Sequence, residues 1–161
     1  MPANLSELSE MPDYLRRMFA GLDVQEACTR PAPDVFAPVE QAWHLADLER
    51  EGFGERIRRL RSEHAPQLPD FAGDRIAMER QYLRLSLPEA LSAFDAARRD
   101  NLAQLAAVAE IEWQRSGVQD GVGTVHLRDI PGLMLAHDRS HRGEIDAWHS
   151  TMTGQAQLRP A

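Results

Sequence analysis

Two histidines one helical turn apart, His137 and His141, are the residues whose type and spacing first suggest chemistry. They lie in the stretch LMLAHDRSHRGEIDAW, residues 133–148, which has the pattern of an uninterrupted amphipathic helix. Because each residue advances a helix by roughly 100°, residues four apart lie about 40° apart and point the same way. The same face carries apolar residues, so both imidazoles are predicted to point into the interior of the protein.

Three interpretations of this pair stay open from the spacing alone. The pair can bind a metal ion, because two imidazoles at i and i+4 on one helix face suit zinc and similar ions. Alternatively, both are core residues hydrogen-bonded to the backbone and to Glu144, which falls in the same stripe of the helix. In the third interpretation the assignment of the helix face is off by a residue or two, and the histidines line a wet groove. Burial of such ionisable groups without partners would cost several kcal/mol.

A metal site needs a further ligand, and His44 is the candidate from another helix. His149 points away from the pair, whereas His64 and His126 lie in or beside loops, where we expect solvated side chains. His44 has acidic neighbours on its helix face rather than an apolar stripe. It is therefore either a surface histidine or one wall of a polar cleft, and spacing does not choose between them.

Helices must position these histidines, because helical periodicity dominates the chain and no strand-like alternation lasts more than a few residues. Four long helices, with a short extra helix between the second and third, predict an all-α four-helix bundle. The long helices are expected at residues 5–20, 37–63, 86–117 and from between 124 and 130 to about 150, the extra helix at 75–85, and a flexible tail at 151–161.

Length, charge and cysteine content restrict the class of protein. The chain has 161 residues, which suits a single domain over 1–161. Its net charge is −7 with acids and bases interspersed, so nucleic acid is not an expected partner. No apolar run approaches the ~20 residues of a membrane helix, and the N-terminus has no signal-peptide core. The lone Cys28 excludes an internal disulfide. We therefore expect a cytoplasmic protein that does not associate with membranes.

Two short motifs, in this order, make the chain resemble the DinB-like superfamily, also called YfiT-like. The first is WHLADLE at 43–49, and the second is AHDRSHRGEI at 136–145. The helix order, the long connection between helices 2 and 3 and the length agree with that family along most of the chain. The resemblance implies a bundle with the spatial order 1-2-4-3, in which helix 2 lies beside helix 4.

The resemblance also implies one divalent metal ion held by His44, His137 and His141. Zinc or nickel is the expected ion, with iron or manganese as alternatives. The family usually has a glutamine where this chain has Glu144, and that departure leaves a basic, catalytic role open for its carboxylate. Three protein ligands leave one coordination position open for water or a thiolate.

Some members of the family are thiol transferases or isomerases that use bacillithiol, mycothiol or glutathione. The resemblance thus implies a metal-dependent S-transferase that joins a low-molecular-weight thiol to a small electrophilic molecule. The alternative is a non-catalytic metal-binding or stress-associated protein. A coordination position that faces a pocket favours the enzyme, and a sealed site favours the structural role. A homodimer and a monomer both stay open.

Residues near the proposed ligands are weighed separately. The pocket candidates are Trp43, Asp47 and Trp148. Asp138 follows His137 but lies about 100° around the helix, so a solvated carboxylate is favoured over a contact with the site. The run RIRRLRSE at 56–63 is interpreted as a solvated basic face, and Cys28 as a structural or incidental residue.

Overall fold

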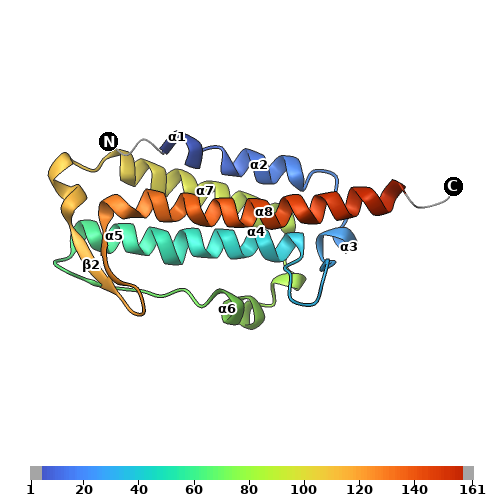
Figure 1. Cartoon of the computed structure of the whole chain (residues 1–161), viewed down its shortest axis with the longest axis horizontal. Coiled ribbons are helices and arrows are strands. Elements are labelled where there is room, and N and C mark those ends of the chain that lie inside the picture. The colour runs from blue at the N-terminus through green and yellow to red at the C-terminus, as the bar shows by residue number, and fades with distance from the viewer. Residues whose placement is uncertain (1–4, 158–161) are drawn as a thin grey trace.

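The computed structural model describes residues 5–157, and most of this span is helical. Four helical rods run side by side, with the first divided into α1 and α2 and the second into α4 and α5 (Figure 1). The predicted helical bundle is therefore confirmed. The bounds of these helices are Leu5–Leu8 (α1), Met11–Met18 (α2), Pro38–Asp47 (α4), Glu55–Ser62 (α5), Leu87–Ala106 (α7) and Ile130–Gln157 (α8).

The second rod contains a π-helical segment, Leu48–Gly54, between α4 and α5. A π-helical turn widens a helix and is frequent at functional sites. The segment contains Gly52 and Gly54, in the middle of the helix expected at 37–63. A Cβ on Gly54 would lie 3.0 Å from Asn101 Oδ1 and from the carbonyl oxygen of Glu49, so glycine permits the close approach of α7 here.

A small three-stranded sheet, which the sequence analysis does not expect, caps one end of the bundle (Figure 1). β2 pairs with β1 in parallel and with β3 in an antiparallel hairpin, in the order β1-β2-β3. Each strand is two to four residues long, too short to produce a visible alternation. The strands span Gln67–Leu68 (β1), Ser116–Gln119 (β2) and Gly123–His126 (β3).

Two helix ends differ from the prediction. α7 ends at Ala106 instead of continuing to Gly117, and a 3₁₀ turn at Glu110–Gln114 leads from it into the sheet. α8 continues to Gln157 rather than ending near residue 150, so the first part of the predicted tail is helical. The rest of that tail, 158–161, lies outside the described residues. Figure 1 shows α8 extending past the ends of its neighbours.

The packing of the rods gives only part of the predicted arrangement. α7 packs against both α4 and α2, and α8 packs against α1 and α2. In the numbering of the predicted order, α4 belongs to helix 2 and α7 is helix 3. Because these two helices pack against each other, the contacts do not confirm the spatial order 1-2-4-3, in which helices 2 and 3 are not neighbours. Helix 4 still meets helix 2, through the histidines described below. A short helix α3, Val24–Ala27, lies in the connection that precedes α4.

The connection between the second and third rods carries α6, Gly73–Arg80, which packs against α4. A 3₁₀ turn at Tyr82–Arg84 follows it. Buried Asp47 anchors this crossover, because its Oδ2 accepts hydrogen bonds from Arg80 and from the Tyr82 hydroxyl, each at 2.6 Å. The crossover is thereby held against the C-terminal end of α4.

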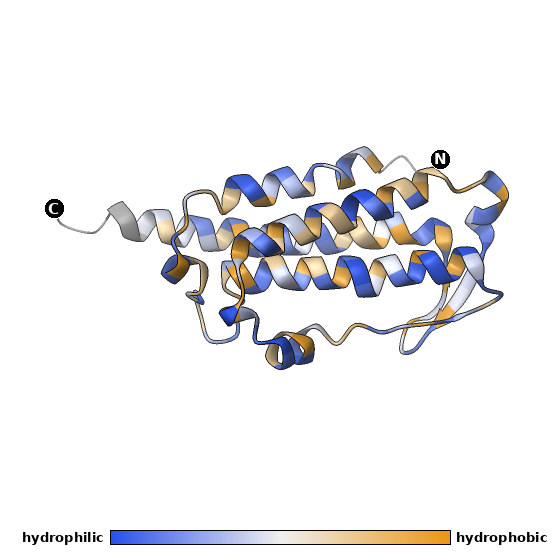
Figure 2. Cartoon of the chain, turned by 180° about the vertical axis from the view of Figure 1, so that it is seen from behind, coloured by the Kyte–Doolittle hydropathy of each residue, from blue (hydrophilic) through white to orange (hydrophobic). Residues whose placement is uncertain are grey.

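The hydrophobic core forms two clusters, one toward each end of the bundle. Along α8, Met134 belongs to one cluster and Ile145 to the other, so His137 and His141 lie between them. Figure 2 shows the hydrophobic and hydrophilic residues alternating along the helices that enclose this core. Within residues 5–157, none of the helices is both long and apolar enough to cross a membrane.

Candidate metal centre

The three predicted ligand residues converge between α4 and α8. His137 Nε2 lies 3.4 Å from His44 Nε2 and 3.1 Å from His141 Nε2. One ring nitrogen from each histidine lies within 4.8 Å of the others. His141 is buried, and the other two are half-buried. The interior orientation expected for His137 and His141 is therefore present.

The tautomer of His141 follows from Gln41, one turn before His44 on α4. His141 Nδ1 lies 2.6 Å from Gln41 Oε1, while Gln41 Nε2 donates to Glu144 Oε2 at 2.6 Å. The carboxylate requires a donor, so the amide oxygen of Gln41 must face the imidazole, and Nδ1 must carry the proton. In the neutral ring, Nε2 of His141 then presents its lone pair toward His44 and His137.

All three histidines favour the neutral form that can bind a metal ion. Burial, followed by the charge of the neighbouring His141, lowers the pKa of His44 to about 4. Burial, followed by the charges of His141 and His44, lowers the pKa of His137 to about 3. Burial alone lowers the pKa of His141 to about 4. At neutral pH the rings are uncharged, as metal ligands must be.

The spacing of the donor nitrogens fits a divalent ion. Two imidazole nitrogens at about 2.0–2.1 Å from one tetrahedral ion lie roughly 3.3–3.4 Å apart. The Nε2 separations of 3.4 and 3.1 Å are close to this value. Three converging imidazole nitrogens also match the ligand preferences of zinc, nickel and iron. The residues present can therefore hold a divalent metal ion.

His44 occupies a crowded position, which decides between the two interpretations left open for it. Its ring lies 5.6 Å from Phe36 and 5.9 Å from Phe71, measured between ring centroids. A Cβ on Gly73 would lie 2.6 Å from its Cε1, so α6 holds the ring from the side. His44 Nδ1 is buried with no hydrogen-bond partner among the described residues. The residue is a wall of a cleft, not a surface histidine.

Two pockets reach the histidines, and His44 lines both. The first has a volume of about 260 Å³ and contains His141 beside three carboxylates, so we name it the acidic pocket. The second has a volume of about 310 Å³ and contains His137, apolar side chains and one arginine, so we name it the Arg56 pocket. The acidic pocket is lined by Asp34, Val35, Phe36, His44, Asp74, His141 and Glu144.

Glu144 lies at the edge of the acidic pocket rather than in the buried stripe predicted for it. Its side chain is 46% exposed, and its Oε2 lies 3.3 Å from His141 Nδ1. The same oxygen accepts from Gln41, so this carboxylate orients the amide that in turn orients His141. Glu144 thus combines solvent access with contact to the histidine site.

Asp138 is buried, which corrects its interpretation as a solvated carboxylate. Its two oxygens accept from both terminal nitrogens of Arg98, at 2.8 and 2.9 Å. Arg98 also donates to both oxygens of Glu49 and to the carbonyl of Leu8. We name Arg98, Glu49, Asp138 and Asn101 the Arg98 cluster; it joins all four rods of the bundle.

The three predicted pocket residues lie close to the site without lining the two pockets that reach it. The Asp47 carboxylate accepts the hydrogen bonds from Arg80 and Tyr82 that anchor the crossover. Trp43 donates from Nε1 to the carbonyl of Ser86 and stacks near Tyr82. Trp148 is buried edge-on against Phe19, with ring centroids 5.7 Å apart. All three act in packing and anchoring in this structure.

The sequence analysis misses three supporting residues: Gln41, Arg56 and Arg98. The interpretation of 56–63 as a solvated face is wrong for Arg56, which is 7% exposed. Its position three residues after Phe53 and four before Leu60 places it on their helix face and is a signal that the sequence contains. Arg98 has no comparable local signal, because its partners come from three other rods.

The other histidines and Cys28 lie away from this centre. His64 and His149 are exposed, and His126 Nδ1 lies 3.3 Å from Asp129 Oδ2. Cys28 Sγ contacts the carbonyl oxygen of Leu83 at 3.3 Å and lines a separate cavity beside α3.

Comparisons with known proteins identify a family and a similar fold. The model of the DinB superfamily matches residues 7–145. A solved structure of YfiT from Bacillus subtilis, described as a probable metal-dependent hydrolase with an unusual four-helix bundle topology, superposes with a TM-score of 0.84 at 15% identity. The match covers 92% of this chain and 85% of that one. The search of curated proteins found no match.

Proposed function

This chain belongs to the DinB superfamily, and we propose that it is a metal-dependent enzyme that acts on small molecules. His44, His137 and His141 would hold one divalent ion, with zinc or nickel favoured by the three imidazole donors. One observation carries the proposal: each of the three converging histidines lines at least one of two pockets, so the site is open to ligands. A non-catalytic metal protein has no need of such access.

The reaction we favour is transfer of a low-molecular-weight thiol to an electrophilic carbon. A divalent ion bound to neutral imidazoles supplies positive charge that favours the ionised form of a nearby thiol or water. Glu144 would accept the thiol proton, because its carboxylate lines the acidic pocket beside His141. The sulfur lone pair then forms the new carbon–sulfur bond, and the leaving group departs with its electron pair.

Gln41 would hold both His141 and Glu144 in the orientations that the reaction requires. Its amide oxygen holds the proton on His141 Nδ1, and its amide nitrogen holds Glu144. The base and the ligand are thus linked through one side chain. A glutamine at position 144, as is usual in the family, would preserve the contact with Gln41 but could not accept a proton.

Hydrolysis is the second candidate, because the similar YfiT structure is described as a probable metal-dependent hydrolase. The two reactions differ only in whether the nucleophile is a thiol or water. Both use the same three histidines and the same carboxylate.

Metal analysis and rate measurements test the proposal together. Purified protein without an affinity tag is expected to bind about one zinc or nickel ion per chain, measured by elemental analysis. Zinc- or nickel-loaded protein should conjugate bacillithiol, mycothiol, glutathione or cysteine to 1-chloro-2,4-dinitrobenzene faster than apo-protein or His137→Ala. Glu144→Gln should retain the metal and lose rate.

The controls separate the alternatives. Cleavage of 4-nitrophenyl acetate without a thiol, by the metal-loaded protein alone, would favour hydrolysis. Equal background rates for loaded protein, apo-protein and His137→Ala with every thiol would favour the non-catalytic metal protein. Absence of bound metal, with no uptake of added zinc or nickel, would overturn the metal site itself.

A further inference from the structure

The Arg56 pocket holds a buried cation that the fold leaves without an anionic partner. Arg56 is 7% exposed, and no carboxylate of a described residue lies within ion-pairing distance of its guanidinium. Its Nε donates to the carbonyl of Pro69 at 3.1 Å, and its Cζ lies 5.5 Å from the centre of the Phe53 ring. Its two terminal nitrogens form no hydrogen bond within residues 5–157, so they are available to a ligand.

Arg56 combines low exposure with the lack of an anionic partner among the described residues. Partial burial lowers the pKa of the Arg56 guanidinium, with only the distant Asp70 opposing the shift. An arginine side chain nevertheless keeps its charge in proteins. A buried charge is normally paired, because an unpaired one loses solvation without compensation. The other deeply buried arginine, Arg98, uses all five of its N–H groups.

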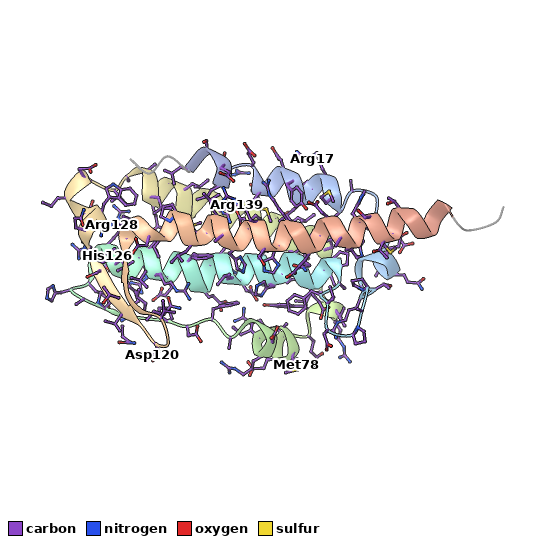
Figure 3. The ribbon with its side chains drawn as sticks, viewed as in Figure 1. Arg17, Met78, Asp120, His126, Arg128 and Arg139 are labelled. Atoms are coloured by element: carbon purple, nitrogen blue, oxygen red, sulfur yellow. The ribbon has the colours of Figure 1, made fainter. Side chains whose placement is uncertain are left out.

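A second unused donor lies in the same pocket. Gln119, on β2, is 8% exposed, and its side-chain amide makes no hydrogen bond to another described residue. The hairpin that carries it turns at Gly121, and Figure 3 shows Asp120 at the hairpin tip, on the same side of the bundle as Met78 of α6. Helix α5 and the hairpin therefore each present an unsatisfied polar side chain to one cavity.

The rest of the cavity is apolar and ends at the histidines. Phe53 lies near both Arg56 and the metal site, with its ring centroid 5.5 Å from Arg56 Cζ and 6.0 Å from the ring centroid of His137. At about 310 Å³ the cavity is at the small end of ligand sites, which suits a molecule about the size of a substituted benzene ring. The lining residues are His44, Leu48, Phe53, Arg56, Phe71, Gln119, Val122, Leu133 and His137.

We propose that the Arg56 pocket is the substrate pocket and that it selects a small apolar molecule with a carboxylate, which binds Arg56 and Gln119. The other end of the molecule then faces His137 and His44. This assignment rests on the proposed function, whose substrate class it specifies. Charge selects between the two pockets, because Asp34, Asp74 and Glu144 would repel an anionic group from the acidic pocket.

The test compares three probes that share one ring: phenylacetate, neutral phenylacetamide and cationic 2-phenylethylamine. Dissociation constants are measured by NMR titration of both zinc-loaded protein and apo-protein. Phenylacetate is expected to bind about tenfold or more tightly than either analogue, the usual effect of a charged hydrogen bond. It should also shift the side-chain amide resonance of Gln119 in the unmodified protein.

Arg56→Met should abolish the preference for phenylacetate, and Arg56→Lys should restore part of it. Arg58→Met is the matched control, because Arg58 lies on the same helix but is exposed and paired with Glu55. It should bind the probes as the unmodified protein does. Far-UV circular dichroism checks that each variant is folded.

Three results would overturn this inference: no preference among the probes, an unchanged preference in Arg56→Met, or a preference seen only with zinc present. The last would mean that the carboxylate binds the ion instead of Arg56. Zinc binding is measured on the same samples. Failure to bind zinc would overturn the proposed function, while the carboxylate preference of apo-protein still decides the role of Arg56.

Discussion

Two buried polar centres meet on α8 at adjacent residues, and they use their polar atoms in opposite ways. Asp138 belongs to the Arg98 cluster, in which Arg98 donates all five N–H groups and both carboxylates accept in pairs. His137 belongs to the histidine centre, in which ring nitrogens face one another without an internal donor for each lone pair. The polar groups of the first centre are satisfied by the fold itself, whereas ring nitrogens of the second remain able to bind a ligand.

The exposed fraction of a side chain does not distinguish a buried polar group with a structural role from one with a functional role, whereas its hydrogen-bond partners do. Asp138 is 3% and His141 8% exposed, so both are buried. What differs is whether the partners of each group are already present in the chain. Buried polar groups are normally hydrogen-bonded, and each unsatisfied one requires an explanation. His44 Nδ1 is such a group and lies in the proposed metal site, while the terminal nitrogens of Arg56, which bond no described residue, line the proposed substrate pocket.

The largest expected effect comes from breaking the satisfied centre. Arg98→Met would leave Glu49 and Asp138 buried without their cation, so we expect a loss of about 3–5 kcal/mol in the free energy of unfolding. Urea denaturation followed by circular dichroism measures it. Adding Glu49→Gln and Asp138→Asn to this variant should recover part of the loss, and a single variant as stable as the original would contradict the assigned role.

Breaking the histidine centre should change ligand binding far more than stability. In His141→Ala one of three metal ligands is missing, and we expect zinc affinity to fall by more than about 100-fold, beyond the effect of losing a supporting residue. Competition with a zinc chelator measures the affinity. The unfolding free energy of the apo-protein should fall less than in Arg98→Met, and the reverse order would remove the distinction between the centres.

A smaller effect is expected from a change at Gly73, where the backbone of α6 lies against the ring of His44, a proposed metal-binding residue. Gly73→Ala would put a methyl group 2.6 Å from His44 Cε1, so the ring must move. We expect zinc affinity to drop by about tenfold while the fold persists. Gly132→Ala on α8, where nothing lies within 4 Å of the added Cβ, is the control and should leave zinc affinity unchanged.

The smallest effect is expected outside both centres. Cys28→Ser keeps a hydrogen-bond donor near the carbonyl of Leu83, so stability should change by no more than about 0.5 kcal/mol. Zinc affinity and any thiol-transfer rate should also be unchanged. If activity disappears while metal content and fold persist, the nucleophile has been misplaced and Cys28 must take part in the reaction.

Sequence patterns were sufficient for features that depend on neighbouring residues. The spacing of His137 and His141 placed both on one helix face, and the helix that starts at Pro38 begins as expected. Long helices were predictable because their periodicity extends over many turns. The short strands and the early end of α7 at Ala106 were not, because tertiary pairing in a few residues leaves no periodic signal.

The sequence alone determined the chemistry of the donor groups, and the motif resemblance selected His44 as the third histidine. Only the tertiary structure decided which polar groups are already satisfied. Asp138 and His137 are consecutive, yet the partners of Asp138 come from α7, and those of His137 from α4 and α8. Hydrogen-bond satisfaction depends on residues brought together from distant parts of the chain, so a single helix pattern does not contain it. For the same reason, Arg56 became a candidate ligand-binding residue only once the hairpin and α5 were seen to line one cavity.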